Sequence, residues 1–124
     1  MKITMIGTGY VGLVSGACFS EFGHQVTCMD KDGKKIARLA QGEIPIYEPG
    51  LKDLVAKNVN EGRLHFTTDM DDAVSNADAV FIAVGTPSHR RGSGYADLSY
   101  IYAAAKELAP HLTGYTVIID KSTV

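Results

Sequence analysis

A glycine-rich segment near the N-terminus, Gly7 to Gly12 (GTGYVG), constrains the fold more than any other feature of the sequence. It follows a short apolar run, Ile3 to Ile6, that predicts a β-strand. It leads into apolar residues at helical spacing, namely Val11, Val14, Cys18 and Phe22. The pattern G-x-G-x-x-G is a weak signal alone, but between a strand and a helix it is typical of dinucleotide-binding folds.

Strand and helix patterns alternate along the rest of the 124 residues. Further strands are expected at 25–30, 64–67, 79–84 and 116–120, and the run 79–84 is apolar enough to be covered on both faces. Helices are expected between them, with Asp32, Asp69 and Asp97 as N-caps. The helix that begins at Asp32 is expected to run through Leu39, and the helix that begins at Asp69 through Ala77. This order predicts an α/β fold, a Rossmann-type doubly wound parallel sheet of about five strands in three layers, α/β/α.

Each part of the glycine segment has an expected role in holding a dinucleotide. Gly7 permits the tight turn, Gly9 leaves room for a pyrophosphate, and Gly12 lets helix and strand pack closely. The backbone N–H groups near Tyr10 and Val11 stand at the positive end of the helix, where a diphosphate is favoured. Two alternatives stay open: a tight turn in an unrelated α/β fold, or a site for S-adenosylmethionine.

Asp30 ends the second expected strand, eighteen residues after Gly12, where an acid accepts hydrogen bonds from the adenosine ribose. A 2′-phosphate there would meet a carboxylate, so we expect NAD rather than NADP as the cofactor. Lys31 and Lys35 are cations that weaken this repulsion. Lys35 lies in the first turn of the next helix, and its side chain leans back toward Asp30; a solvated surface lysine is the alternative.

Hydroxyl side chains follow the fourth and fifth expected strands, at Thr86 and Thr123. Doubly wound sheets bind ligands at the carboxyl ends of their strands, so both threonines would face a dinucleotide lying across the sheet. A role as simple turn formers is an equal alternative.

Charge and composition exclude several classes of protein. Twelve basic and fourteen acidic residues give a net charge of −2, which argues against a nucleic-acid or membrane-surface binder. No apolar run approaches the length that spans a bilayer. Cys18 and Cys28 have neither disulfide nor metal spacing and are expected to be buried packing residues. We expect a cytoplasmic protein without a metal site.

Four segments resemble, in this order, the motifs of the UDP-glucose/GDP-mannose dehydrogenase family, over the whole chain: GTGYVG at 7–12, YEPGL at 47–51, VGTP at 84–87 and KSTV at 121–124. The resemblance implies an oxidoreductase of polysaccharide biosynthesis that oxidises a nucleotide sugar twice at C6 with two NAD, through a cysteine thioester. It implies cofactor contacts from Gly7, Gly9, Tyr10, Val11, Gly12, Asp30, Lys35, Thr86 and Thr123. Thr123 would also position the catalytic water.

Members of this family are longer than this chain. The resemblance therefore implies that residues 1–124 are the NAD-binding domain, and that the central helix, the nucleotide-sugar domain and the nucleophilic cysteine lie elsewhere. We expect this chain to bind NAD without turnover. The parent protein is expected to oxidise UDP-glucose to UDP-glucuronate, and GDP-mannose and UDP-N-acetylmannosamine are the alternative substrates. The alternative function for the chain is a stand-alone nucleotide-binding or regulatory module. The parent is expected to be a homodimer and this chain a monomer, unless the surface it shares with missing parts makes it associate. The YEPGL and VGTP segments argue against a 3-hydroxyacid dehydrogenase.

Overall fold

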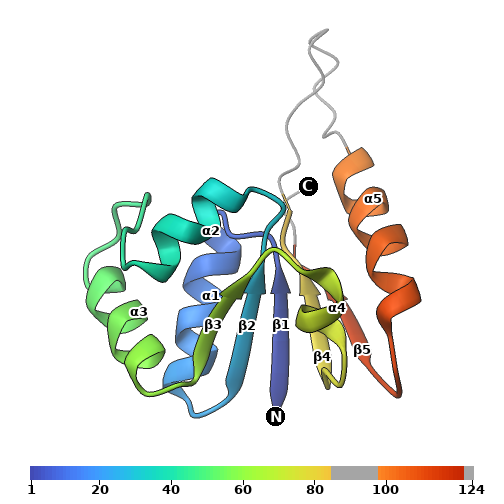
Figure 1. Ribbon diagram of the computed structural model, residues 1–124, viewed down its shortest axis with the longest axis horizontal. Coiled ribbons are helices and arrows are strands. Elements are labelled where there is room, and N and C mark those ends of the chain that lie inside the picture. Colours follow the sequence, from blue (N-terminus) through green and yellow to red (C-terminus); the bar gives the residue numbers. More distant parts are fainter. Residues whose placement is uncertain (85–97, 122–124) are drawn as a thin grey trace, which may run out of the picture.

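The computed structural model describes residues 1–84 and 98–121. Five parallel strands form one sheet in the order β3-β2-β1-β4-β5 (Figure 1). The strands are β1 (Lys2–Ile6), β2 (Gln25–Met29), β3 (Leu64–Thr67), β4 (Ala79–Ile82) and β5 (Val117–Asp120). The helices are α1 (Tyr10–Glu21), α2 (Gly33–Ala40), α3 (Leu51–Asn60), α4 (Met70–Val74) and α5 (Ser99–Leu108), and a 3-10 turn at Ala109–His111 follows α5. The predicted fold class and element order are confirmed.

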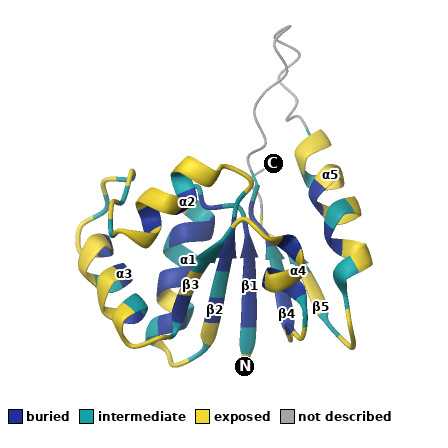
Figure 2. Cartoon of the chain, viewed as in Figure 1, coloured by how far each residue is buried: buried dark blue, intermediate teal, exposed yellow. Residues whose placement is uncertain are grey.

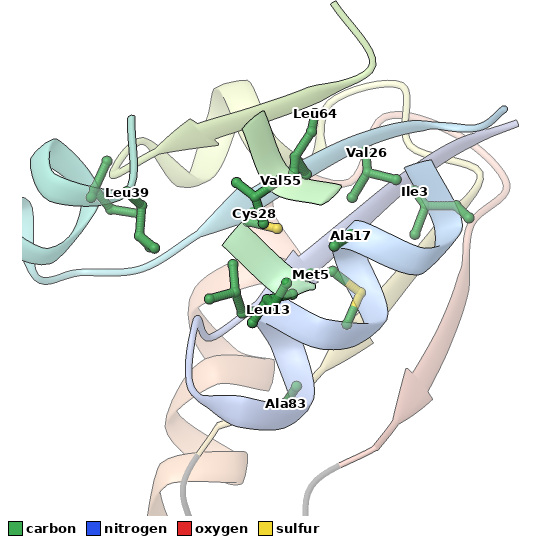
Figure 3. Close-up of a cluster of buried hydrophobic side chains, with 12 residues drawn as sticks. Ile3, Met5, Leu13, Ala17, Val26, Cys28, Leu39, Val55, Leu64 and Ala83 are labelled. Carbon is green, nitrogen blue, oxygen red and sulfur yellow. The ribbon is translucent and has the colours of Figure 1, made fainter. Parts of the chain in front are cut away.

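Two apolar cores, one on each face of the sheet, hold the layers together (Figure 2). Side chains alternate across a strand, so Ile3 and Met5 of β1 join the core formed with α1, α2 and α3 (Figure 3). Ile6 joins the core formed with α4 and α5. Thr4 also faces α4, and its hydroxyl donates a hydrogen bond to the carbonyl of Ala73. The sheet is therefore covered on both faces, as a doubly wound fold requires.

The strand order places a ligand crevice at the centre of the sheet. The chain moves outward from β1 through β2 to β3, then crosses back to β4 on the other side of β1. The order reverses between β1 and β4, and in open α/β sheets ligands bind at such a point, beyond the carboxyl ends of the strands. All five strands are parallel, so these ends gather at one edge, at the top in Figure 1.

The sequence prediction for the buried face of α1 was only partly right, because Val11 and Val14 pack against the core but Cys18 and Phe22 do not. The side turned to the sheet is made of small residues and one leucine, namely Gly12, Leu13, Gly16, Ala17 and Ser20. Cys18, predicted to be buried, is exposed, and Phe22 is 79% exposed. The reason is close packing: a Cβ atom on Gly16 would lie 2.8 Å from Sγ of Cys28, so only a side without bulk fits here. Cys28 is fully buried as predicted.

Helix ends follow their capping residues. The carboxylate of Asp32 accepts the N–H groups of Lys34 and Lys35 at the start of α2, as predicted. Asp69 caps α4 in the same way, but that helix ends at Val74 rather than Ala77, because Ser75 leaves the helical conformation (ψ 126°) and Asn76 after it is left-handed (φ 63°). Asp97, predicted to cap α5, lies outside the described residues. Within 1–84 and 98–121, no helix is long and apolar enough to cross a membrane.

Candidate dinucleotide site

A cleft of about 750 Å³ opens at the carboxyl ends of the central strands. One wall is the loop after β1, and a second is formed by Asp30, Lys31 and Lys35 after β2. Helix α5 supplies the opposite wall with Tyr100, Ala103 and Glu107. The cleft thus lies at the crevice that the strand order predicts.

The three motif glycines differ in what surrounds them. Gly7 has φ 106°, and a Cβ on it would lie 2.5 Å from the carbonyl oxygen of Ala83. A Cβ on Gly12 would lie 2.0 Å from the carbonyl oxygen of Gly7. A Cβ on Gly9, in contrast, would meet no described atom within 4 Å. Gly7 and Gly12 are therefore required by packing, whereas the open space beside Gly9 faces the cleft and is available to a ligand.

The start of α1 presents backbone donors to this open space. Gly9 is the N-cap and has no side chain to cap the helix, and the first turn carries no acidic residue. The first N–H groups of any helix lack partners within the helix, and the helix dipole makes this end positive. The residues present therefore fit a diphosphate, which these donors and this dipole stabilise.

The carboxylate of Asp30 lies beside the loop, held by Thr8. Oδ2 of Asp30 accepts the hydroxyl of Thr8 at 2.6 Å and its backbone N–H at 3.1 Å, and Oδ1 accepts the N–H of Asp32 at 3.1 Å. Burial opposes ionisation, but these hydrogen bonds and the charge of Lys35 outweigh it, so the pKa of Asp30 lies below its ordinary value. Asp30 is therefore an ionised, acceptor-only group at neutral pH.

Both lysines beside Asp30 are engaged by carboxylates. Nζ of Lys35 lies 3.7 Å from Oδ2 of Asp30, in agreement with the predicted lean of its side chain. Nζ of Lys31 lies 2.6 Å from Oε2 of Glu107, on α5 at the opposite wall of the cleft. The part of the cleft beside Asp30 is therefore nearly neutral in charge.

Three residues of this region were not identified from the sequence. Thr8 stands at a variable position of the motif, although a hydroxyl between two glycines beside a strand-end acid was a usable signal. Glu48 accepts a hydrogen bond from the hydroxyl of Tyr10 at 3.1 Å, and this bond together with the charge of Glu48 raises the pKa of Tyr10. Glu107 lies far along the chain, and no local pattern indicates its contact with Lys31.

Other predicted site residues cannot be placed. Thr86 and Thr123 lie outside the described residues, as does the segment 89–91 (HRR). The two cysteines are not at the cleft. Cys28 is buried between sheet and helix, which raises its pKa to about 12. Cys18 lies eight residues along α1 from Tyr10, about 12 Å of helix away.

Comparison with known proteins agrees with this geometry. All 124 residues match the model of the UDP-glucose/GDP-mannose dehydrogenase family, NAD binding domain. The chain is 66% identical over its full length to a UDP-glucose 6-dehydrogenase of Rhizobium meliloti, and 58% identical over 99% of its length to UDP-glucose 6-dehydrogenase TuaD of Bacillus subtilis. It spans 28% and 26% of those two proteins.

Among solved structures, a ternary complex of GDP-mannose dehydrogenase from Pseudomonas aeruginosa superimposes with a TM-score of 0.93 at 39% identity. The match covers all of this chain and 29% of that one. The family model matches the whole chain, and the fold carries Gly7, Gly9 and Asp30 at one cleft. The chain belongs to the UDP-glucose/GDP-mannose dehydrogenase family and corresponds to its NAD-binding domain.

Proposed function

We propose that the cleft holds NAD with the pyrophosphate against the start of α1. The open space beside Gly9 and the uncapped N–H groups of Tyr10 and Val11 support this position. Gly7 and Gly12 act indirectly. Gly7 lets the loop pack against the backbone of Ala83, and Gly12 lets the start of α1 pack against the backbone of Gly7. NAD supplies a hydride acceptor, and the chain's own residues bind and orient it.

Asp30 binds the adenosine ribose in this proposal, and Lys35 lies beside it. A carboxylate has about four acceptor positions, of which Thr8 and Asp32 use three. The remaining position accepts a ribose hydroxyl. Ionised Asp30 repels a 2′-phosphate, so NAD binds more tightly than NADP. Thr8 keeps the carboxylate in place before the cofactor arrives.

Thr86 and Thr123 are proposed at the nicotinamide half, with Thr123 positioning the water that completes the reaction. Support comes from their sequence positions after β4 and β5, whose carboxyl ends lie at the edge of the sheet that holds the cleft.

For the whole protein we propose oxidation of UDP-glucose to UDP-glucuronate with two NAD. The observation that carries this proposal is the 66% identity to a UDP-glucose 6-dehydrogenase. GDP-mannose is the second candidate because the structure of a GDP-mannose dehydrogenase superimposes closely. The nucleophilic cysteine, the central helix and the sugar-nucleotide domain are proposed to lie outside this chain, which spans about a quarter of its relatives. We also propose that the parent protein is a homodimer. We propose a cytoplasmic location, because the two cysteines are free thiols and a reducing compartment keeps thiols free.

Calorimetric titration of the chain with NAD and with NADP tests the cofactor assignment. Asp30→Ala should weaken NAD binding by about 1.5–3 kcal/mol, the value of a hydrogen bond to a charged group, and NADP binding by less. Asp53→Ala is the matched control, because Asp53 is exposed on α3 and does not line the cleft. Equal losses for both cofactors contradict the ribose assignment.

The substrate assignment needs the whole protein. NADH formation is measured with UDP-glucose, GDP-mannose and UDP-N-acetylmannosamine offered separately, and UDP-glucose should give the highest kcat/KM. The 124-residue chain alone should form no NADH with any of them. Turnover by this chain would contradict the proposal that the nucleophile lies elsewhere.

A further inference from the structure

An ion pair spans the adenosine end of the cleft from one wall to the other. Lys31 directly follows Asp30 after β2, and its ammonium lies 2.6 Å from the carboxylate of Glu107 on α5. Both residues line the cleft, and their side chains are 68% and 37% exposed.

A bound NADP would need a cation beside its 2′-phosphate. In dinucleotide folds that accept NADP, a basic residue near the strand-end acid binds the 2′-phosphate. Two candidates exist among the described residues that line this cleft. Nζ of Lys35 lies 3.7 Å from Oδ2 of Asp30, whereas Nζ of Lys31 lies 2.6 Å from Oε2 of Glu107. A 2′-phosphate therefore meets the Asp30 carboxylate without a free cation beside it.

We propose that Glu107 determines cofactor specificity by holding Lys31, in addition to the repulsion that Asp30 exerts. This inference rests on the proposed position of the adenosine ribose at Asp30. The carboxylate of Glu107 neutralises the ammonium and fixes it against α5. Without that carboxylate, the flexible lysine side chain turns back over the cleft and pairs with the doubly charged phosphate.

The same ion pair contributes little to folding, which makes the two roles separable. Exposed ion pairs stabilise proteins weakly because water screens both charges. NAD has no 2′-phosphate, so its affinity does not depend on a free Lys31. Loss of Glu107 is therefore expected to change NADP binding and to leave both stability and NAD binding nearly unchanged.

Glu107→Gln, which keeps the size of the side chain, is the test variant. Calorimetric titration should show about three- to tenfold tighter NADP binding, with NAD affinity within about twofold of wild type. Glu43→Gln is the matched control, since it makes the same change in net charge at an exposed position that does not line the cleft. It should change neither affinity.

The double variant Lys31→Gln/Glu107→Gln identifies the cation. If Lys31, once released from Glu107, binds the 2′-phosphate, the gain in NADP affinity disappears in this double variant. An unchanged NADP affinity in Glu107→Gln overturns the proposal, and so does a gain that persists without Lys31. Failure of the underlying ribose assignment looks different, because Asp30→Ala then weakens NAD and NADP equally.

Discussion

The motif glycines Gly9 and Gly12 should respond differently to alanine, although a sequence motif treats them alike. At Gly12 the new Cβ lies 2.0 Å from the carbonyl oxygen of Gly7, a backbone atom that cannot rotate away. Overpacking of this kind costs about 1–3 kcal/mol, partly offset by up to about 1 kcal/mol from the higher helix propensity of alanine. At Gly9 the Cβ meets no described atom, and the backbone (φ −74°, ψ −163°) suits alanine.

Gly9→Ala should therefore fold normally and bind NAD poorly, because its methyl group takes the space proposed for the pyrophosphate. Its melting temperature should fall by less than about 4 °C, which corresponds to about 1 kcal/mol in a domain of this size. Gly12→Ala should lose both stability and binding. Gly33→Ala, in the first turn of α2 with no described atom near its Cβ, is the control that should lose neither.

Calorimetric melting and NAD titration on the same samples separate the two effects. The reasoning is refuted if Gly9→Ala binds NAD like wild type, since the open space would then not be where the pyrophosphate lies. It is also refuted if Gly9→Ala melts as low as Gly12→Ala, since the space would then not be open.

Three further predictions concern the acid and the thiols. Because the pKa of folded Asp30 lies below its ordinary value, Asp30 stabilises the fold above about pH 4 and loses this contribution as the pH falls through the folded pKa. The difference in free energy of unfolding between wild type and Asp30→Asn should therefore shrink on acidification. A difference that is constant with pH would contradict the charge-based explanation. Gly16→Ala should destabilise the fold by about 1–3 kcal/mol in urea unfolding, and adding Cys28→Ala should recover part of the loss, because Sγ is the nearest atom at 2.8 Å; no recovery would locate the strain elsewhere. A thiol reagent should modify Cys18 in the native chain and Cys28 only after unfolding, since Cys18 is exposed and Cys28 is buried with a pKa of about 12; modification of both at once in the native chain would argue against this core.

The sequence was sufficient for features that local pattern determines. The glycine motif, the strand-end position of Asp30 and the cap at Asp32 each depend on residues close together in the chain. The lean of Lys35 toward Asp30 also follows from its place in the first helical turn. The doubly wound parallel sheet follows because alternating strands and helices leave few topologies open.

Features that depend on tertiary contact were missed or wrong. The buried face of α1 was predicted only in part, because Gly12, Gly16 and Ala17 carry little hydrophobic signal, yet close approach to the sheet selects them. The pair between Lys31 and Glu107 joins residues 76 positions apart (107 − 31), so no periodicity reveals it.

The central claim is that NAD binds at the carboxyl ends of β1 and β2 against the start of α1. Amide chemical shifts of the chain, measured by NMR with and without NAD, test it residue by residue. We predict that the largest shifts fall on Gly9 to Gly12, on Asp30 to Lys35 and on the cleft side of α5. Saturable binding with the largest shifts at the amino ends of the strands, around Lys2 and Gln25, would contradict it, as would a folded chain whose spectrum does not respond to NAD.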